Sequence, residues 1–367
     1  MIYKQFQDLQ LSRLGMGNMR LPVNQGRIDR KKAQEIIDYA MEQGINYYDT
    51  AYVYHSGESE PFLGEALNKY PRDSYYLATK FYVMANPDIE QVFEEQLCKL
   101  RTDYIDFYLI HCVNEETIGA YTAKNRHYMD FLLEQKAKGR IRHIGFSSHG
   151  KPETLEKFLN WSDAFEFVQI QLNYLDWTMQ NAKRQYEIIT EHGLSVWVME
   201  PVRGGRLASL GERYDAMLKQ ARPDWSVPAW AFHWLMGLSG VAMILSGMTT
   251  MEQIRDNAAT FQKEEVLTPE QNMLLTNVAA GYQSHLAVPC TACRYCCDGC
   301  PEHIDIPRWM NLYNELHLTH DKATWERAME GAVNPAACIG CGQCTSHCPQ
   351  TIDLPGYLQK LSRWPVR

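Results

Sequence analysis

The chain has 367 residues, of which 45% are hydrophobic and 22% charged, with a formal net charge of −8 at pH 7. This composition is typical of a globular protein with a sizeable core, and the acidic balance argues against a nucleic-acid partner. No signal peptide follows Met1, and no apolar run approaches the roughly 18 residues that span a membrane. We therefore expect a cytoplasmic protein that does not associate with membranes.

Short runs of β-branched and aromatic residues alternate with amphipathic helical segments over the first three-quarters of the chain. A hairpin is predicted at Met1–Leu11, before a first strand at Leu14–Met19. Further strands are predicted at Ile45–Thr50, Tyr75–Lys80, Tyr104–His111, His143–Ser147, Phe165–Gln171, Ser195–Glu200 and Val241–Ser246. Helices are predicted between them at Lys31–Gln43, Glu60–Asn68, Ile89–Leu100, His127–Lys138, Thr154–Leu159, Asn181–Glu191, Val227–Met236 and Met251–Ala259. Eight strand–helix units in about 260 residues predict a (β/α)8 TIM barrel, with a doubly wound α/β sheet as the weaker alternative.

A further helix at Thr268–Gln283 leads to Pro289, after which the first of many cysteines appears. We place the domain boundary in this segment. The predicted domains are a barrel over residues 1–285 and a small metal-binding domain over residues 286–367.

The cysteines of the second domain repeat one spacing. It reads Cys290-x2-Cys293-x2-Cys296-x3-Cys300-Pro301 and again Cys338-x2-Cys341-x2-Cys344-x3-Cys348-Pro349. Each run resembles the motif of bacterial ferredoxins, which implies a small α-rich domain with two [4Fe-4S] clusters. The resemblance also implies crossed ligand sets, in which the first three cysteines of each run share a cluster with the last cysteine of the other.

Two zinc sites are the alternative, but tetrahedral zinc has no use for the third cysteine and the Cys-Pro pair. Cys297 interrupts the first run, and a shifted ligand set that uses it stays open. We expect Cys297 to be a spectator.

Four chemically active residue types stand at the carboxyl ends of successive predicted strands, where TIM barrels carry their active sites. Asp49 ends the second strand, Tyr54 lies five residues further on, Lys80 ends the third strand and His111 ends the fourth. Reduction of a carbonyl needs a hydride on carbon and a proton on oxygen, and a tyrosine with a pKa of about 10 is a poor proton donor at neutral pH.

A neighbouring Lys80 cation would lower the pKa of Tyr54, and Asp49 would hold the Lys80 ammonium in place. His111 would donate a hydrogen bond to the carbonyl oxygen as charge develops on it. The alternative is a structural Asp49–Lys80 ion pair beside an ordinary interior histidine. The four residues resemble, in type, order and location, the Asp–Tyr–Lys–His tetrad of the aldo/keto reductase family.

The whole chain resembles the ferredoxin-containing branch of that family, which implies an NAD(P)H-dependent oxidoreductase acting on a small carbonyl compound in anaerobic or microaerobic metabolism. The resemblance also implies a set of cofactor-binding positions: Ser147, Ser148, Gln169, Met199, Ser246, Gly247, Met248, Thr249, Gln253, Asp256 and Asn257. The Ser246–Thr249 turn precedes a helix, whose free N–H groups can hold a phosphate.

The sequence departs from the family at four of these positions. Serine at Ser148 replaces an asparagine, and Met199 stands where a tyrosine often stacks on the nicotinamide. No basic residue occupies Gly247, and Gln253 stands where arginine is commoner. The choice between NADH and NADPH is therefore open. The missing aromatic ring also leaves FMN open as a cofactor.

Arg203-Gly204-Gly205-Arg206 follows the seventh strand. It is interpreted either as a loop that binds the cofactor pyrophosphate or an acidic substrate, or as a flexible loop with solvated arginines.

Three functions remain open at this level. The first is a carbonyl reductase whose clusters are structural. The second is an enzyme whose clusters exchange electrons with an external ferredoxin or flavoprotein through a flavin or a radical-tolerant substrate. The third is a non-catalytic barrel that serves as an electron-carrier scaffold.

Overall fold

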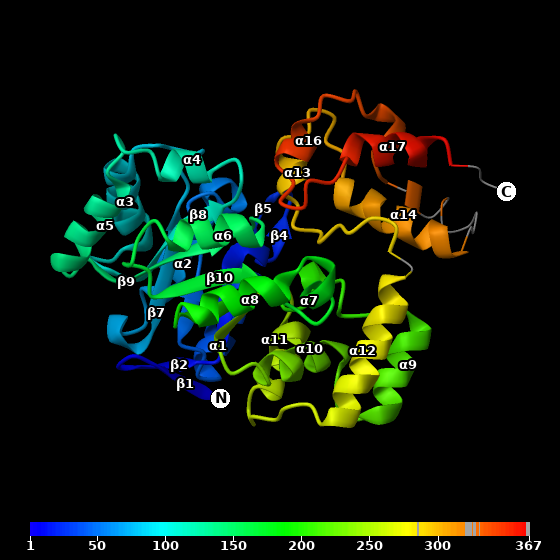
Figure 1. Cartoon of the computed structure of the whole chain (residues 1–367), viewed down its shortest axis with the longest axis horizontal. Helices are drawn as coiled ribbons and strands as arrows, with labels where there is room; N and C mark the ends of the chain where they lie inside the picture. Colours follow the sequence, from blue (N-terminus) through cyan, green and yellow to red (C-terminus); the bar gives the residue numbers. More distant parts are fainter. Residues whose placement is uncertain (285, 320–324, 326–327, 330, 365–367) are drawn as a thin grey trace. The chain divides into compact units, whose positions relative to one another are not determined.

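The computed structural model describes residues 1–284, 286–319, 325, 328–329 and 331–364. The chain divides into two compact units, each described here by itself (Figure 1). The barrel unit comprises Met1–Pro201 and Arg222–Asn272, and the cluster unit comprises Val202–Ala221 and Met273–Arg367.

Eight parallel strands form a closed barrel in the order β10-β11-β12-β3-β6-β7-β8-β9. They are β3 (Leu14–Gly17), β6 (Tyr47–Asp49), β7 (Tyr76–Phe81), β8 (Ile105–Val113), β9 (Ile141–Ser148), β10 (Phe167–Gln171), β11 (Ser195–Met199) and β12 (Val241–Ser246). The pairing of Ile244 in β12 with Leu14 in β3 closes the ring. This closure confirms the predicted TIM barrel and excludes the doubly wound sheet, which has two open edges.

Helices follow the strands on the outside of the barrel (Figure 1). They are α1 (Arg30–Glu42), α2 (Ser59–Leu67), α3 (Ile89–Leu100), α5 (Tyr128–Ala137), α6 (Pro152–Leu159), α8 (Ala182–Glu191), α10 (Val227–Met236) and α11 (Met251–Thr260). Their bounds agree with the predicted helices to within one or two residues. Short additional turns, α4 (Ile118–Tyr121), α7 (Asp176–Met179) and the hairpin β4 (Val23–Asn24) with β5 (Arg27–Ile28), lie in loops.

The amino end of the barrel is sealed by the predicted hairpin, whose strands are β1 (Tyr3–Phe6) and β2 (Leu9–Ser12). The Phe6 ring lies edge-on to Trp197 at 4.8 Å between centroids, and it also contacts Phe107 and Phe167. Glycine is required at Gly145, because a Cβ there would lie 2.5 Å from the Phe167 ring. Close-packed rings therefore fill this end, and the carboxyl ends of the strands are left for chemistry.

The cluster unit is built from helices, as predicted for the second domain. These are α9 (Glu212–Ala221), most of α12 (Pro269–Gln283), α13 (Tyr295–Asp298), α14 (Ile306–Thr319), α16 (Gln343–Ser346) and α17 (Leu354–Ser362). Its core includes Trp309 and Leu358, which are 0% and 1% exposed. The Trp309 indole N–H donates to the Val333 carbonyl at 3.1 Å, so this polar group is satisfied within the core.

The compact units differ from the predicted domains at residues 202–221 and 273–284, which group with the two cysteine runs. Helix α9, which the sequence analysis did not predict, contacts α12 through the rings of Tyr214 and Tyr282, 6.4 Å apart. The predicted boundary at residue 285 itself lies outside the described residues.

The two cysteine runs share one backbone conformation. Ala292 and Arg294 have φ of 56° and 72°, and their counterparts Gly340 and Gly342 have φ of 70° and 77°. His303 and Thr351, three residues after the last cysteine of each run, are also left-handed, with φ of 52° and 50°. The sequence repeat is therefore a structural repeat, in which Thr345 is the counterpart of Cys297.

Candidate active site and cluster pockets

A buried ion pair lies at the carboxyl ends of β6 and β7. The Lys80 ammonium donates to both carboxylate oxygens of Asp49 at 2.7 Å and to the Thr50 carbonyl at 2.6 Å. Lys80 is 0% exposed and Asp49 is 3% exposed. These three contacts use the three N–H donors of the ammonium and fix its position.

Tyr54 and His111 complete the group. Tyr54 begins the 3-10 turn Tyr54–Gly57, and the Lys80 nitrogen lies 4.9 Å from the centre of its ring. The His111 ring, near the end of β8, stands edge-on to the Tyr54 ring at 5.8 Å. The structure thus brings all four predicted residues together at one end of the barrel.

Burial governs the protonation of these groups. The pKa of His111 is held well below its usual value by burial, and next by the Lys80 charge, so this imidazole is neutral at pH 7. Burial lowers the pKa of Lys80 and raises that of Asp49, and the mutual attraction of the two groups opposes both shifts. The Nδ1 atom of His111 is buried and has no hydrogen-bond partner among the described residues.

Two further titratable residues near the tetrad were not assigned from the sequence. Glu60 is 0% exposed and lies close to Lys80. Its carboxylate accepts hydrogen bonds from Thr79 at 2.6 Å and from Gln96 at 2.7 Å. Glu60 stands in the first turn of α2, where an acidic side chain is common because it interacts favourably with the helix dipole. His149 follows β9, and burial lowers its pKa to about 4. No sequence signal marks His149, because only the closed barrel places it near His111.

The predicted nicotinamide-binding residues lie at the carboxyl ends of β9, β10 and β11. The Ser147 hydroxyl accepts from the Cys112 N–H at 2.9 Å, and Ser148 accepts from the Gly150 N–H at 3.3 Å. The Gln169 amide nitrogen lies 3.7 Å from the Met199 sulfur. The Gln169 amide oxygen is buried and unpaired within the described part of the chain, so it is suited to accept from a carboxamide such as that of nicotinamide.

The turn between β12 and α11 is held largely by its own side chains. Asn257 donates to Ser246 at 3.0 Å, and Asp256 accepts from Ser226 at 2.6 Å. The Gln253 oxygen accepts from the Thr249 N–H at 2.7 Å and, at 3.3 Å, from the Thr250 N–H. Two of the N–H groups that were predicted to hold a phosphate are therefore occupied by Gln253. Met248 is 0% exposed, so it contributes to the core.

A basic residue does lie beside Gly247, although not at that position in the sequence. A Cβ on Gly247 would lie 3.0 Å from the Cβ of Arg20, which follows β3. The Arg20 guanidinium pairs with Glu200 at 3.0 Å, and the Arg20 carbonyl accepts from the Thr249 hydroxyl at 2.7 Å.

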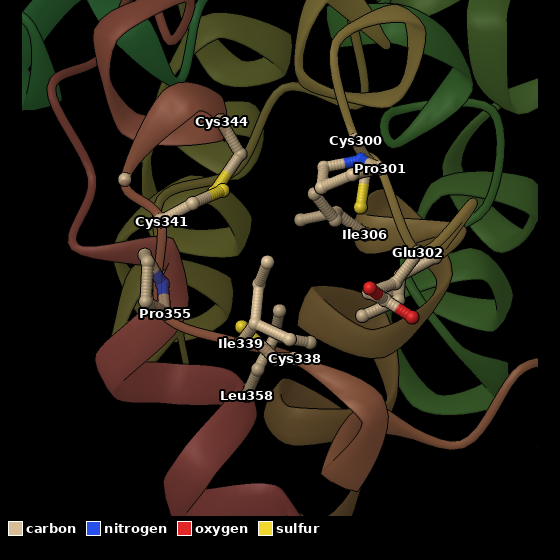
Figure 2. A pocket seen from close by; sticks show the side chains of 12 residues that line it. Cys300, Pro301, Glu302, Ile306, Cys338, Ile339, Cys341, Cys344, Pro355 and Leu358 are labelled. Atoms are coloured by element: carbon tan, nitrogen blue, oxygen red, sulfur yellow. The ribbon is translucent and has the colours of Figure 1, made fainter.

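Two pockets in the cluster unit are each lined by four cysteines. The first pocket is lined by Cys290, Cys293, Cys296 and Cys348, and the second by Cys338, Cys341, Cys344 and Cys300. Figure 2 shows Cys300 across the second pocket from Cys341 and Cys344. Cys297 lines neither pocket.

The walls of both pockets are mainly apolar, with Ile352 and Leu354 in the first and Ile304, Ile306 and Leu358 in the second. Among the described residues, no three His, Cys, Asp or Glu side chains converge on a point that suits a single ion. Four thiols spread around a hollow fit a multi-iron cluster better than one tetrahedral zinc ion.

The aldo/keto reductase family model matches residues 13–280, which span the barrel and the tetrad. The chain belongs to the aldo/keto reductase family. A 4Fe-4S dicluster domain matches residues 289–352, which include both cysteine runs. The enzyme is thus an oxidoreductase with an aldo/keto reductase barrel and a C-terminal 4Fe-4S domain, as the sequence resemblance predicted.

Two curated relatives match about two-thirds of the enzyme, and a solved structure matches about three-quarters. It is 28% identical to the NADH-specific methylglyoxal reductase of Escherichia coli over 301 residues, which covers 69% of this chain and 90% of the relative. It is 27% identical to the uncharacterized oxidoreductase YqkF of Bacillus subtilis, covering 68% and 87%. The structure of aldo-keto reductase AKR11C1 from Bacillus halodurans aligns with a TM-score of 0.64 at 28% identity, covering 76% of this chain and 96% of that one.

The Arg203–Arg206 segment donates hydrogen bonds to other parts of the cluster unit. Arg203 donates to the Pro289 and Cys290 carbonyls, and Arg206 donates to the Pro307 carbonyl and to the Asn311 side chain. Both guanidinium groups thus bind protein acceptors within the cluster unit.

Within the described residues, no helix combines the length and apolar character needed to cross a membrane.

Proposed function

We propose that the enzyme reduces a small-molecule carbonyl compound at the tetrad Asp49, Tyr54, Lys80 and His111, with NADH or NADPH as the reductant. The observation that supports this most directly is the buried Lys80–Asp49 pair beneath the Tyr54 ring, with a neutral His111 beside it. A structural ion pair alone would not need a tyrosine and a histidine converging on the same lysine.

Each residue has one role in this proposal. Tyr54 donates the proton to the carbonyl oxygen, and the Lys80 charge stabilises the tyrosinate that is left. Asp49 and the Thr50 carbonyl hold Lys80 in place, so they are positioning groups. The neutral His111 imidazole donates a hydrogen bond to the oxygen on which negative charge develops.

The nicotinamide cofactor, when bound, supplies the hydride. The unpaired Gln169 oxygen, Ser147 and Ser148 are the groups that would hold its carboxamide, beside Met199. Arg20, packed against Gly247 and paired with Glu200, is the basic residue proposed to contact a cofactor phosphate. The name of the E. coli relative supports an NADH-linked reduction of a small carbonyl compound.

The eight cysteines that line the two pockets are proposed to hold two [4Fe-4S] clusters in crossed ligand sets. Such clusters carry one electron at a time and need a reducing compartment, which favours the cytoplasm. Cys341 is exposed, and the neighbouring Ile339 is 65% exposed. This open edge favours a second role, electron exchange with an external ferredoxin or flavoprotein.

The test of the carbonyl reductase is Tyr54→Phe, with Tyr52→Phe as the matched control. Tyr52 lies in the same loop, and its hydroxyl donates to Glu95 at 3.0 Å. Loss of proton transfer should lower kcat for methylglyoxal or another small aldehyde by about 10² or more, whereas the control should keep its activity. Unchanged kcat in Tyr54→Phe, with the iron content intact, would exclude the tetrad mechanism.

A further inference from the structure

The loop that follows β11 has an unusual backbone. Arg203, Gly204 and Gly205 are consecutive left-handed residues, with φ of 50°, 63° and 92°. A non-glycine residue in this region costs on the order of 1–3 kcal/mol, which the surroundings must offset. The Arg203 residue is 1% exposed, although its side chain carries a charge. Both observations indicate that contacts of the Arg203 side chain, and not the turn alone, hold this residue in its conformation.

The contacts of Arg203 converge on the first cysteine of the first pocket. One guanidinium nitrogen donates to the Pro289 carbonyl at 2.9 Å, and the other donates to the Cys290 carbonyl at 3.3 Å. The Cys290 sulfur accepts from the Ala292 N–H at 3.4 Å, within the left-handed turn of the run. Arg203 therefore fixes the backbone from which this thiol projects.

Arg206, three residues later, makes a comparable attachment away from the cysteines. It donates to the Pro307 carbonyl at 3.3 Å and to the side chain of Asn311 in α14. Arg206 thus belongs to the same loop and carries the same charge, but its acceptors are not cysteine residues.

We propose that Arg203 positions Cys290 in the first pocket and raises the reduction potential of the cluster bound there. The inference rests on the proposed binding of clusters by the two pockets. A cluster with four thiolate ligands becomes more negative on reduction, and a nearby cation shielded from water favours the more negative state. The first pocket is also lined by Arg294, which pairs with Asp305 at 3.0 Å, whereas the second is lined by Glu302.

The difference in charge around the two pockets has a direct consequence. The cluster of the first pocket should accept an electron at a less negative potential than the cluster of the second. An electron that enters at the exposed Cys341 edge would then settle in the first pocket.

The test uses the full-length holoprotein in a Cys341→Ala background, in which only the first pocket keeps all four cysteines. The midpoint potential of the remaining cluster is measured by an anaerobic redox titration followed by electron paramagnetic resonance. Arg203→Gln should shift this potential to a more negative value, and Arg203→Lys, which keeps the charge, should stay near the parent. The matched control Arg206→Gln should leave the potential unchanged.

An unchanged potential in Arg203→Gln would overturn the proposal, and so would an equal shift in Arg206→Gln. The rate at which a chelator removes iron provides a second readout that does not need the glutamine variant to fold. Arg203→Lys loses the two-pronged contact with Pro289 and Cys290, so iron loss should be several-fold faster than in the parent. Equal rates would overturn the positioning role.

These results are separable from the proposed function. Absence of the [4Fe-4S] signal in the parent protein would refute cluster binding itself. A normal parent with unaltered Arg203 variants would refute only the role of Arg203.

Discussion

Burial sets the protonation states of the residues at the tetrad. His111 is neutral because it is buried beside a cation, and a neutral imidazole can still donate one N–H to an oxygen. Lys80 and Asp49 are each shifted toward neutrality by burial and toward charge by the other. Removal of either partner would leave a buried charge unpaired, which typically costs about 3–5 kcal/mol.

His149 makes stability depend on pH in a predictable direction. Its pKa is about 4 in the folded protein because of burial, and about 6.5 when unfolded. Below pH 6.5 the unfolded state therefore binds the proton first, and stability falls as the pH decreases toward 4. We expect His149→Asn to remove this component of the pH dependence.

The measurement is urea unfolding of both proteins, followed by a signal from the barrel, at pH 7.5 and at about pH 5.5. Between pH 7.5 and pH 5.5, the free energy of unfolding of the wild type should fall by about 1.4 kcal/mol more than that of the variant. The reason is that pH 5.5 lies one unit below the pKa of the unfolded histidine, and one pH unit is worth about 1.4 kcal/mol. Parallel losses in the two proteins would show that His149 is not buried as a neutral base.

At the scale of single elements, the side chain of Gln253 caps the start of α11. Thr250 and Gln253 form a capping box, and the Gln253 oxygen covers the N–H groups of Thr249 and Thr250. The same arrangement occurs at α12, where Thr268 and Gln271 exchange hydrogen bonds at 3.2 and 2.9 Å. Only the first of these helix starts lies at the predicted cofactor site.

We therefore expect Gln253→Ala and Gln271→Ala to lower stability similarly, by about 1 kcal/mol each. Gln253→Ala should in addition free two N–H donors and raise the affinity for NADPH relative to NADH several-fold. Thermal unfolding and fluorescence titration with both nucleotides measure these effects. An equal ratio of NADPH affinity to NADH affinity in the two variants would show that the cofactor phosphate does not bind these two N–H groups.

At the scale of the molecule, the two cysteine runs are interdependent, because each pocket is completed by the last cysteine of the other run. Cys300→Ala should therefore damage the cluster of the second pocket, which is otherwise formed by residues 338–344. The iron content should fall from about eight to about four atoms per chain.

Cys297→Ala is the matched control, because Cys297 lies near the same run but lines neither pocket. It should keep the full iron content. Selective loss of the cluster bound by Cys290, Cys293 and Cys296 in the Cys300→Ala variant would refute the crossed arrangement.

Most of the fold could be predicted because local patterns report burial. Val241–Ser246 was predicted with its observed bounds, since a short run of apolar residues between turns is typical of a buried strand. The strand at His143–Ser147 was predicted too short, because Arg142 is polar while its backbone still belongs to the barrel. Helix α9 was missed because its residues are mostly polar and its partner α12 lies more than 45 residues further along the chain.

The sequence by itself determined the barrel, the tetrad positions and the two cysteine runs, because periodicity and spacing record which residues share a face or a ligand. Only the tertiary structure decided that Arg20 lies against Gly247 and that Arg203 binds the Cys290 backbone. It also decided that Glu60 is buried near Lys80 and that the half-buried His149 lies near His111. Each of these depends on side chains that meet across strands or loops far apart in the chain. Such contacts leave no local sequence pattern, because they are determined by how the whole chain packs.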